Sequence, residues 1–460
     1  MLAPINRIPP EILALIPDFW DAWGRDRNII ALTHVCRAWR EVFISRSSLW
    51  SDFDYTNKEK TQVYFERSKS SPINLSLDLR NCVFPCDSFF QFIPRVTGRL
   101  KSLFVNGPLE DVEVVTSRLS HPAPLLERLS IFAQCYSGPY RYLPLTSGLF
   151  DGDLSSLRTL RLAQVCTGLP WRNMINLTSF TLSYTSSEMV TIGQLLDFFE
   201  GAPYLEEVKL SYAIPTTGAQ NGRVVSLECL KSMHIQDDNR PSVLLSHLLI
   251  PVGARLEVQA KVFRYPIGEV LPRSLDNLKN FANFTAVKLN FNDMEFSGPN
   301  GRVKISNTLF GEDMTDLTLG LLTDLDTSKT ERLEIGDCDL PSKEPLYQAL
   351  LPMKDLRTLK LSGFVSLDIF IRALQPFTNS SEAMVCPKLE ELVLTPCPFY
   401  RGRDPFRITS ILEVAAARAL EGGKLKTVKI FRRRGRTSLN MPELTELRKH
   451  VWNVEHDYMD

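Results

Sequence analysis

From about residue 70 onward the chain repeats one hydrophobic pattern: an apolar residue, two others, an apolar residue, one other and an apolar residue. The pattern occurs eleven times, as LKSLFV, LERLSI, LRTLRL, LTSFTL, LEEVKL, LKSMHI, FTAVKL, MTDLTL, LRTLKL, LEELVL and LKTVKI, which begin at residues 100, 126, 157, 177, 205, 230, 284, 314, 356, 389 and 425. The last two apolar positions of the pattern alternate with positions expected to be exposed, which is the period of a strand with one buried face. Most copies begin 20 to 36 residues apart, so the pattern predicts a series of short strands.

Helical patterns lie between several of these strands. In TIGQLLDFFEGAPYLEEVKL the apolar residues between 192 and 199 share one helical face, and Gly201 and Pro203 end the helix before the next strand. The same order of helix, break and strand recurs in PLYQALLPMKDLRTLKL and ILEVAAARALEGGKLKTVKI. Alternation of helices with strands predicts a curved parallel sheet with helices or loops on its outer side.

The period and core of this pattern resemble the leucine-rich-repeat family, in its irregular, cysteine-containing form, over roughly residues 70–440. Three strands are followed by a cysteine at the position where this family carries asparagine or cysteine, namely Cys82, Cys338 and Cys397. A thiol there can bond to the backbone as the chain turns, so we expect these cysteines to be structural. The pattern fades over 236–283, where GARLEV is one degraded copy, and is poorly phased over 314–356.

The first 50 residues show a different, helical pattern. Proline is tolerated at a helix start, and IPPEIL begins a short helix whose apolar face includes Ile12, Leu13 and Ile16. The apolar residues between Leu32 and Phe43 form one further stripe, on a single helix or on two short helices that share a face. A unit of this size is marginal for a core of its own, so it is expected to be stabilised by a partner that covers its apolar surface.

Three short motifs in this region occur in the order found in an F-box, namely IPPEIL (8–13), VCRAW (35–39) and LW (49–50). The chain therefore resembles a fungal-type F-box protein with C-terminal leucine-rich repeats. It departs from the family in Ile8, which replaces the usual leucine, and in the longer, more aromatic segment PDFWDAWGRDRN. The resemblance implies a substrate receptor of a Skp–cullin–F-box (SCF) ubiquitin ligase. Its F-box would dock a Skp-family adaptor, and its repeats would bind a protein substrate.

The resemblance also implies which residues contact the adaptor. The implied set is Pro9, Ile12, Leu13, Ile16, Leu32, Val35, Cys36, Trp39 and Trp50. Some of these residues must form the core of the unit itself, and Trp39 is a good candidate for that role. An alternative also remains open, in which the chain is a repeat scaffold outside any ligase and its F-box-like segment packs on its own solenoid.

The predicted organisation is a small helical domain followed by an α/β solenoid. We expect an F-box domain at 1–54, a linker at 55–70, the leucine-rich-repeat solenoid at 71–440 and a capping helix at 441–460. The substrate would meet the exposed strand positions between the apolar ones. Candidates are Arg158, Arg161, Glu207, Lys209, Arg357 and Lys360. The simpler interpretation of each is a solvent-exposed side chain on the strand face with no binding role.

Composition narrows the function further. Lys and Arg together number 53, as do Asp and Glu, and this zero net charge argues against nucleic acid or an anionic membrane as the main partner. The start lacks a signal-peptide pattern and no apolar stretch could span a bilayer, so a cytoplasmic or nuclear protein is expected. Nine irregularly placed cysteines predict reduced thiols. The nucleophile, phosphate-binding and zinc signatures of common enzymes are absent, so we expect neither catalytic residues nor a metal or cofactor.

Overall fold

The computed structural model describes residues 8–19, 25–55, 57–81, 87–135, 141–167, 174–185, 190–215, 217–218, 222–238, 241–260, 270–290, 293–307, 322–323, 325–336, 344–363, 367–375, 384–396, 407–433 and 441–459. The chain divides into two compact units, Met1–Asn221 and Gly222–Asp460. Each unit is described by itself below.

Short helices begin the first unit. They are α1 (Pro10–Leu15), η2 (Ile16–Phe19), α2 (Arg25–Thr33), α3 (Arg37–Ser45) and η3 (Ser47–Trp50). As predicted, α1 has a proline in its first turn. The stripe that follows is divided between two helices, because Cys36 is extended (φ −158°, ψ 175°) and separates α2 from α3.

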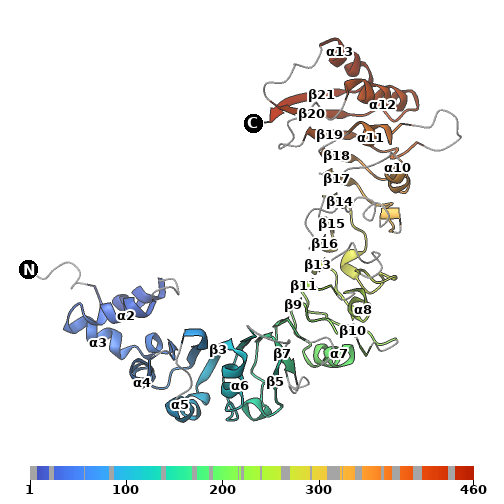
Figure 1. The fold of residues 1–460 in the computed structure, drawn as a ribbon. Helices are drawn as coiled ribbons and strands as arrows, with labels where there is room; N and C mark the ends of the chain where they lie inside the picture. Colours follow the sequence, from blue (N-terminus) through green and yellow to red (C-terminus); the bar gives the residue numbers. More distant parts are fainter. Residues whose placement is uncertain are drawn as a thin grey trace, which may run out of the picture. The chain divides into compact units, whose positions relative to one another are not determined.

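A parallel sheet forms the rest of the first unit (Figure 1). Its strands, in spatial order, are β1 (Asp52–Asp54), β2 (Ile73–Asp78), β3 (Leu100–Pro108), β4 (Arg128–Gln134), β6 (Thr159–Ala163), β8 (Ser179–Ser183) and β9 (Glu207–Ser211). Helices α4 (Lys58–Arg67), α5 (Asp87–Thr97), α6 (Leu109–Thr116) and α7 (Ile192–Gly201) alternate with them, with η4 (Leu79–Asn81), η5 (Leu149–Gly152) and the small pair β5 (Leu143–Leu145) and β7 (Val165–Thr167). Figure 1 shows α5, α6 and α7 along one side of the strands, as expected for stacked repeats.

The segment predicted as a linker is part of the solenoid. Residues 58–67 form α4, and the ring of its buried Tyr64 meets that of Trp50 edge-on with centroids 5.0 Å apart. The preceding strand β1 pairs with β2 in parallel. The sequence KEKTQVYFER is so polar that its narrow buried stripe is not recognisable by composition.

The second unit contains a longer, mostly parallel sheet. Its strands, in spatial order, are β11 (Ser232–Gln236), β13 (Arg255–Ala260), β16 (Gly301–Asn307), β15 (Asp293–Gly298), β14 (Ala286–Leu289), β17 (Arg332–Gly336), β18 (Thr358–Gly363), β19 (Glu391–Pro396), β20 (Thr427–Arg433) and β21 (Asn453–Met459). The other elements are α8 (Pro241–Leu245), η9 (Lys279–Phe281), α10 (Glu344–Leu350), α11 (Leu367–Arg372), α12 (Ile408–Leu420), α13 (Met441–His450) and the small pair β10 (Val225–Ser226) and β12 (Leu248–Leu249).

Two features of this sheet differ from the predicted pattern. Strand β15 runs antiparallel to both β14 and β16, and a tight turn between Gly298 and Gly301 joins it to β16. Gly301 has φ +128°, and a Cβ there would lie 2.7 Å from the carbonyl oxygen of Ala254, so only glycine fits. At the C-terminal end the predicted capping helix covers 441–450, and residues 453–459 add a strand.

The repeat pattern predicts most of the strands correctly. Ten of its eleven copies lie on strands, and the degraded copy GARLEV lies on β13; MTDLTL (314–319) lies outside the described residues. In these ten copies the last two apolar residues of the pattern are buried, as Leu103 and Val105 are in β3. The three cysteines predicted to be structural, at 82, 338 and 397, also lie outside the described residues.

A buried cation connects two repeats of the second unit. Arg418 of α12 is fully buried and donates from Nη1 to the carbonyl of Val385 (2.8 Å) and from Nη2 to that of Cys386 (2.7 Å). Its Nε has no hydrogen-bond partner among the described residues. Burial lowers the pKa of Arg418 and raises that of the Cys386 thiol to about 12, so this thiol is neutral. The guanidinium therefore holds α12 against the turn that precedes β19.

Candidate binding surfaces

The N-terminal helices expose a set of apolar side chains. Ile12 is 55% exposed and Val35 56%, while Leu15 and Ile30 are 44% and 40% exposed. The other exposed or half-buried members of the predicted adaptor set are Pro9, Ile16, Leu32 and Cys36. Leu15 and Ile30 were not in that set, although the spacing of Leu15 from Ile12 places both on one side of α1. Exposed aliphatic side chains on so small a unit are typical of a docking surface.

Three residues of the predicted adaptor set lie in the core of the unit instead. Leu13, Trp39 and Trp50 are buried. The Trp39 ring meets that of Phe43 edge-on at 5.8 Å, and Trp50 Nε1 donates to the Phe43 carbonyl at 2.9 Å. These side chains hold the helices together and are not accessible to a partner that docks on the folded surface.

Two arginine side chains also join the helices by hydrogen bonds to backbone carbonyls. Arg40 Nε donates to the carbonyl of Thr33 at 2.9 Å, and Arg46 Nη1 donates to that of Ala14. These contacts hold α2 against α3, and α1 against the end of α3. Ile12 and Val35 remain exposed, so the described part of the chain does not cover them.

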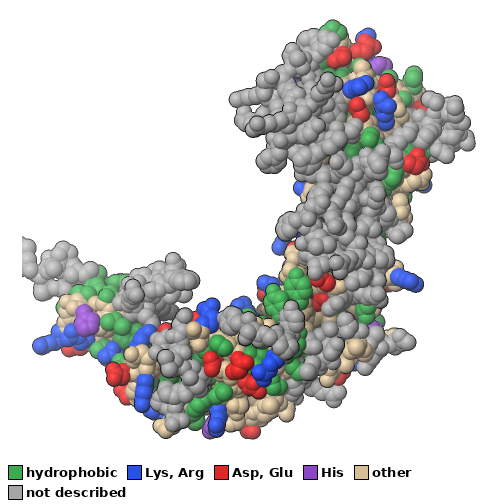
Figure 2. Space-filling view, viewed as in Figure 1, with side chains coloured by type: hydrophobic (Ala, Val, Ile, Leu, Met, Phe, Trp, Pro, Cys, Tyr) green, Lys and Arg blue, Asp and Glu red, His purple; other side chains and the backbone are tan. Residues whose placement is uncertain are grey.

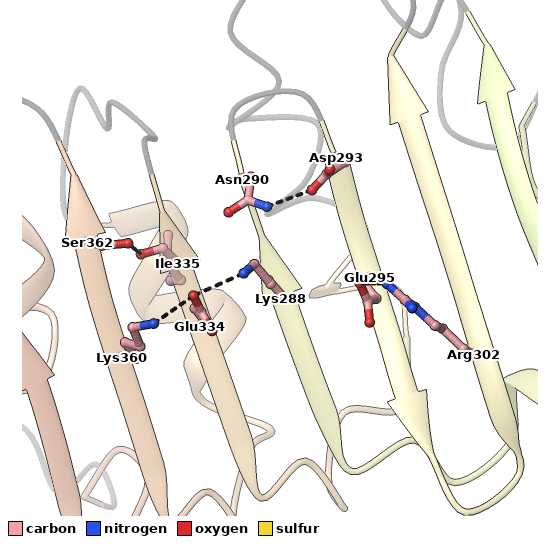
Figure 3. Close-up of polar contacts among 9 residues, drawn as sticks. All are labelled: Lys288, Asn290, Asp293, Glu295, Arg302, Glu334, Ile335, Lys360 and Ser362. Carbon is pink, nitrogen blue, oxygen red and sulfur yellow. Dashed lines mark hydrogen bonds and ion pairs between the residues drawn. The ribbon is translucent and has the colours of Figure 1, made fainter. Parts of the chain in front are cut away.

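In the second unit, side chains at matching strand positions form a row of alternating charge, and Figure 3 shows four of them, Glu295, Lys288, Glu334 and Lys360. Cross-strand partners in this row are His234, Glu257, Lys304, Glu295, Lys288, Glu334, Lys360, Val393, Lys429 and Glu455, from β11 to β21. We call this row the charge ladder. Opposite charges directly across adjacent strands stabilise a sheet, whereas like charges destabilise it.

Ion pairs neutralise much of the charge ladder. Glu334 contacts Lys288 at 3.2 Å and Lys360 at 3.0 Å, as Figure 3 shows. Burial raises the pKa of Glu334, but the hydrogen bonds from the two lysines outweigh burial, so the net pKa is lowered and the carboxylate is ionised. Lys429 similarly contacts Glu391 at 2.9 Å. The predicted substrate residue Lys360 is therefore already paired.

Arg357, the other candidate in this unit, is also paired. Its Nη1 lies 3.4 Å from Glu390 Oε1, and Lys426 Nζ lies 2.8 Å from the same oxygen. The pKa of Glu390 is lowered, chiefly by the hydrogen bond from Lys426. Both second-unit candidates thus face an acidic partner rather than open solvent alone.

The four candidate substrate-binding residues of the first unit are not paired in this way. Arg158, Arg161, Glu207 and Lys209 are all exposed, and none forms an ion pair with another described residue. Arg161 and Lys209 occupy the same row of the sheet, because both are cross-strand partners of Thr181. The register therefore brings two unpaired cations to one face.

Aromatic residues that sequence analysis did not select lie on the same sheet. The half-buried Phe104 and Phe132, on neighbouring strands, have ring centroids 5.6 Å apart. Beyond the ends of β8 and β9, Tyr184 and Tyr212 stack at 5.4 Å with an interplanar angle of 16°. The signal that could have found Phe104 and Phe132 is their place at the exposed positions of strands, where most repeats carry polar or charged residues.

The described residues hold little that points to another class of site. They contain no group of three or more His, Cys, Asp or Glu placed to bind a metal ion, and none of their helices is long and apolar enough to cross a membrane. None of the five described cysteines forms a disulfide with another described residue. On the face visible in Figure 2, described acidic and basic side chains are interspersed, without a broad area of one sign.

The described residues also line one pocket, of about 300 Å³, beside η9. Lys279, Asn283, Phe284 and Lys329 are among its lining residues. Lys329 Nζ donates to the side-chain oxygen of Asn283, which occupies part of its hydrogen-bonding capacity. Asp326, also in the lining, has a lowered pKa because it accepts hydrogen bonds from Ser328, so its carboxylate is ionised and not suited to act as an acid.

Comparisons with known proteins identify no family for the chain. No protein-family model matches the chain, and no curated protein matches it. Among solved structures, the crystal structure of a TLR13–ssRNA13 complex matches with 18% sequence identity and a TM-score of 0.31, over 72% of this chain and 48% of that chain. The chain thus spans about half the length of that protein. By its own strand order and register it is a leucine-rich-repeat-like solenoid with long, mostly parallel sheets.

Proposed function

We propose that the chain is the substrate-recognition subunit of an SCF-type ubiquitin ligase. Helices α1 to α3 bind a Skp-family adaptor, and the solenoid binds a protein substrate. The observation that carries the proposal is the exposure of four apolar side chains, Ile12, Leu15, Ile30 and Val35, on the surface of a small helical unit whose own core does not cover them. Together with the three ordered motifs IPPEIL, VCRAW and LW, this surface fits helix-mediated docking of an adaptor.

The chain would act as a binding protein and not as the catalyst. A ligase raises the rate of ubiquitin transfer by holding a substrate lysine near the activated ubiquitin, which is an effect of effective concentration. Within the first unit, Trp50 packs on Tyr64 and β1 pairs with β2, so the helices are joined to the first repeats by a core and a ladder rather than a loose linker. A stiff connection of this kind would keep a substrate bound to the first repeats at a constant distance from the adaptor.

Co-purification of the full chain with a Skp-family adaptor tests this proposal. The test variant is Ile12→Asp with Val35→Asp, because both side chains are exposed and their replacement spares the buried tryptophans. The matched control is Val114→Asp with Leu125→Asp, which changes two exposed aliphatic residues elsewhere in the first unit. We expect a stoichiometric complex with wild type and control, and none with the test variant. Wild-type protein that is folded by circular dichroism and yet fails to bind would refute the ligase role.

The alternative is a repeat scaffold that recruits no ligase. The observation in its favour is the burial of Leu13, Trp39 and Trp50, which shows that these motif residues have a structural use without any partner. If the alternative is correct, the adaptor binds neither the wild type nor the test variant nor the control variant. The test variant then behaves like the wild type in every binding assay.

A further inference from the structure

We infer that the exposed face of β3 to β9 in the first unit binds an extended acidic peptide that also carries an apolar side chain. We call this face the first-unit face. The inference names the ligand class of the proposed substrate-binding solenoid, and it depends on that binding role but not on the adaptor.

The first step of the argument is charge. Arg161 and Lys209 on this face form no ion pair with another described residue, and neither does Arg158, which lies just before β6. Arg128 bonds to an amide oxygen, that of Asn74, at 3.1 Å. Glu207 is the one exposed acid of β9, and it lies two residues from Lys209. The unpaired charge of this group is therefore net positive and complements an acidic ligand.

Three other acids on or beside the same sheet are paired with cations. Asp54 contacts Lys60 at 2.9 Å, Asp78 contacts Arg80 at 2.6 Å and Glu127 contacts Lys101 at 3.4 Å. The pKa of Asp78 is lowered chiefly by the hydrogen bond from Arg80. These carboxylates are each compensated by a local cation, which leaves the four cations above available.

The second step is spacing. Arg161 and Lys209 share a row but are separated by β8, so their backbones lie about 9.6 Å apart, two strand spacings. Arg128 and Arg161 lie on adjacent strands, offset by two residues, at about 8 Å. Carboxylates two or three residues apart in an extended peptide repeat every ~7 to 10 Å, which matches this spread. A single phosphate favours donors that converge on one group, so the spacing favours Asp and Glu side chains over one phosphorylated residue.

The third step is the apolar component. Phe104 is the cross-strand partner of Ser130, which is in turn the partner of Arg161. Phe132 is the cross-strand partner of Ala163, so it is a diagonal neighbour of Arg161 on the adjacent strand, and Phe104 lies one strand further away. An aromatic cluster bordered by arginine is the usual composition of the central part of a protein interface. Phe104 and Phe132 would contact an apolar side chain of the peptide while the cations contact its carboxylates.

The described part of the second unit offers no comparable surface for such a ligand. The lysines of its charge ladder are already paired with carboxylates, as Lys288 and Lys360 are with Glu334, so an acidic peptide would have to approach these carboxylates and compete with them. Like charges brought close together oppose binding. The first-unit face is therefore the better surface for an acidic peptide.

Fluorescence anisotropy with the full chain tests the inference. The probe is a labelled peptide with Asp or Glu at alternate positions and a central leucine. Two further probes have Asn and Gln in place of the acids, with and without a single phosphoserine. The test variant is Arg161→Glu with Lys209→Glu, and the control is Lys58→Glu with Arg118→Glu, exposed cations away from the strands with the same change in net charge.

We expect the acidic peptide to bind and the neutral one not to bind. The test variant should weaken binding at least about tenfold, the control should stay within about twofold of wild type, and added salt should weaken binding. If the charge reversal lowers the melting temperature, Arg161→Gln with Lys209→Gln should still weaken binding, by a smaller factor.

Three results would overturn the inference. They are equal binding of acidic and neutral peptides, an equal loss in the control variant, and binding of the phosphoserine peptide alone, which would indicate a phosphate reader. Failure of adaptor binding with intact peptide binding would refute the ligase role and leave the inference in place.

Discussion

Replacing the buried Arg418 tests how the repeats of the second unit are held together. Its guanidinium contributes the described hydrogen bonds between α12 and the turn before β19, to the carbonyls of Val385 and Cys386. We compare Arg418→Ala with Arg418→Met, which keeps most of the volume and removes the charge. The two variants separate the contribution of packing from that of the hydrogen bonds.

The magnitudes follow from these contacts. Truncation to alanine leaves a cavity, which costs about 2–5 kcal/mol, and a buried carbonyl without its donor, which costs about 1–3 kcal/mol. Methionine fills the cavity and removes a cation that is costly to bury. The remaining loss of stability is then that of the carbonyl without a donor, at most about 1–3 kcal/mol. We therefore expect stability in the order wild type, Arg418→Met, Arg418→Ala.

Hydrogen exchange is the suitable assay, because a chain of two units and many repeats does not unfold in one step. A loss of about 4 kcal/mol should accelerate exchange by roughly 10³-fold over residues 384–396 and 408–420. Exchange over residues 100–108 of the first unit should not change, because repeat stability is local. If Arg418→Met is more stable than wild type, the cost of burying the charge exceeds the value of its hydrogen bonds. If Arg418→Ala exchanges as slowly as wild type, the structural role is refuted.

Three further predictions concern other contacts. Glu334→Gln should destabilise the second unit by about 0.5–2 kcal/mol at low salt and less at high salt, measured by thermal melting. Because the folded-state pKa of Glu334 is lowered, its stabilisation is present above the ordinary carboxyl pKa and is lost as pH falls through the folded value, so the two melting curves should converge in acid. Trp50→Ala should cost about 3–5 kcal/mol and make the N-terminal helices sensitive to limited proteolysis, with no change in the cleavage of the second unit. Gly107→Ala should cost about 1–3 kcal/mol in a melting experiment, because a Cβ there would lie 2.5 Å from Leu79 Cβ, whereas Gly98→Ala has space and should cost less.

The strands of the solenoid could be predicted because their signal is local. The spacing of leucines in a segment such as LRTLRL is enough to place a buried face on β6. The antiparallel strand β15 could not be recognised in the same way, because antiparallel and parallel strands share one side-chain period. Strand β21 escaped prediction because NVEHDYM is mostly polar and forms the last strand, where little of it is buried.

The candidate surfaces were predictable only in part. Alternation places Lys360 and Lys209 at exposed positions, and both are at least partly exposed. Whether such a lysine is paired depends on the neighbouring strand, and Glu334 lies 26 residues away in the chain. Likewise, the motif VCRAW does not show which residue faces solvent; that is decided by the break at Cys36, which leaves Val35 outside and Trp39 in the core.

The charge ladder limits how the second unit can change in length. Its basic and acidic positions alternate from strand to strand, and the neutral Val393 occupies an acidic place without altering the order. Gain or loss of one repeat would bring two like charges into adjacent strands about 4.8 Å apart, whereas gain or loss of a pair would preserve the alternation. Duplication and deletion of repeats in this unit should therefore be tolerated in even numbers. The exceptions are loss of one strand next to Val393 and duplication of the Val393 strand itself, which leave no like charges on adjacent strands. The alternating charges therefore favour changes in the length of the unit by an even number of repeats.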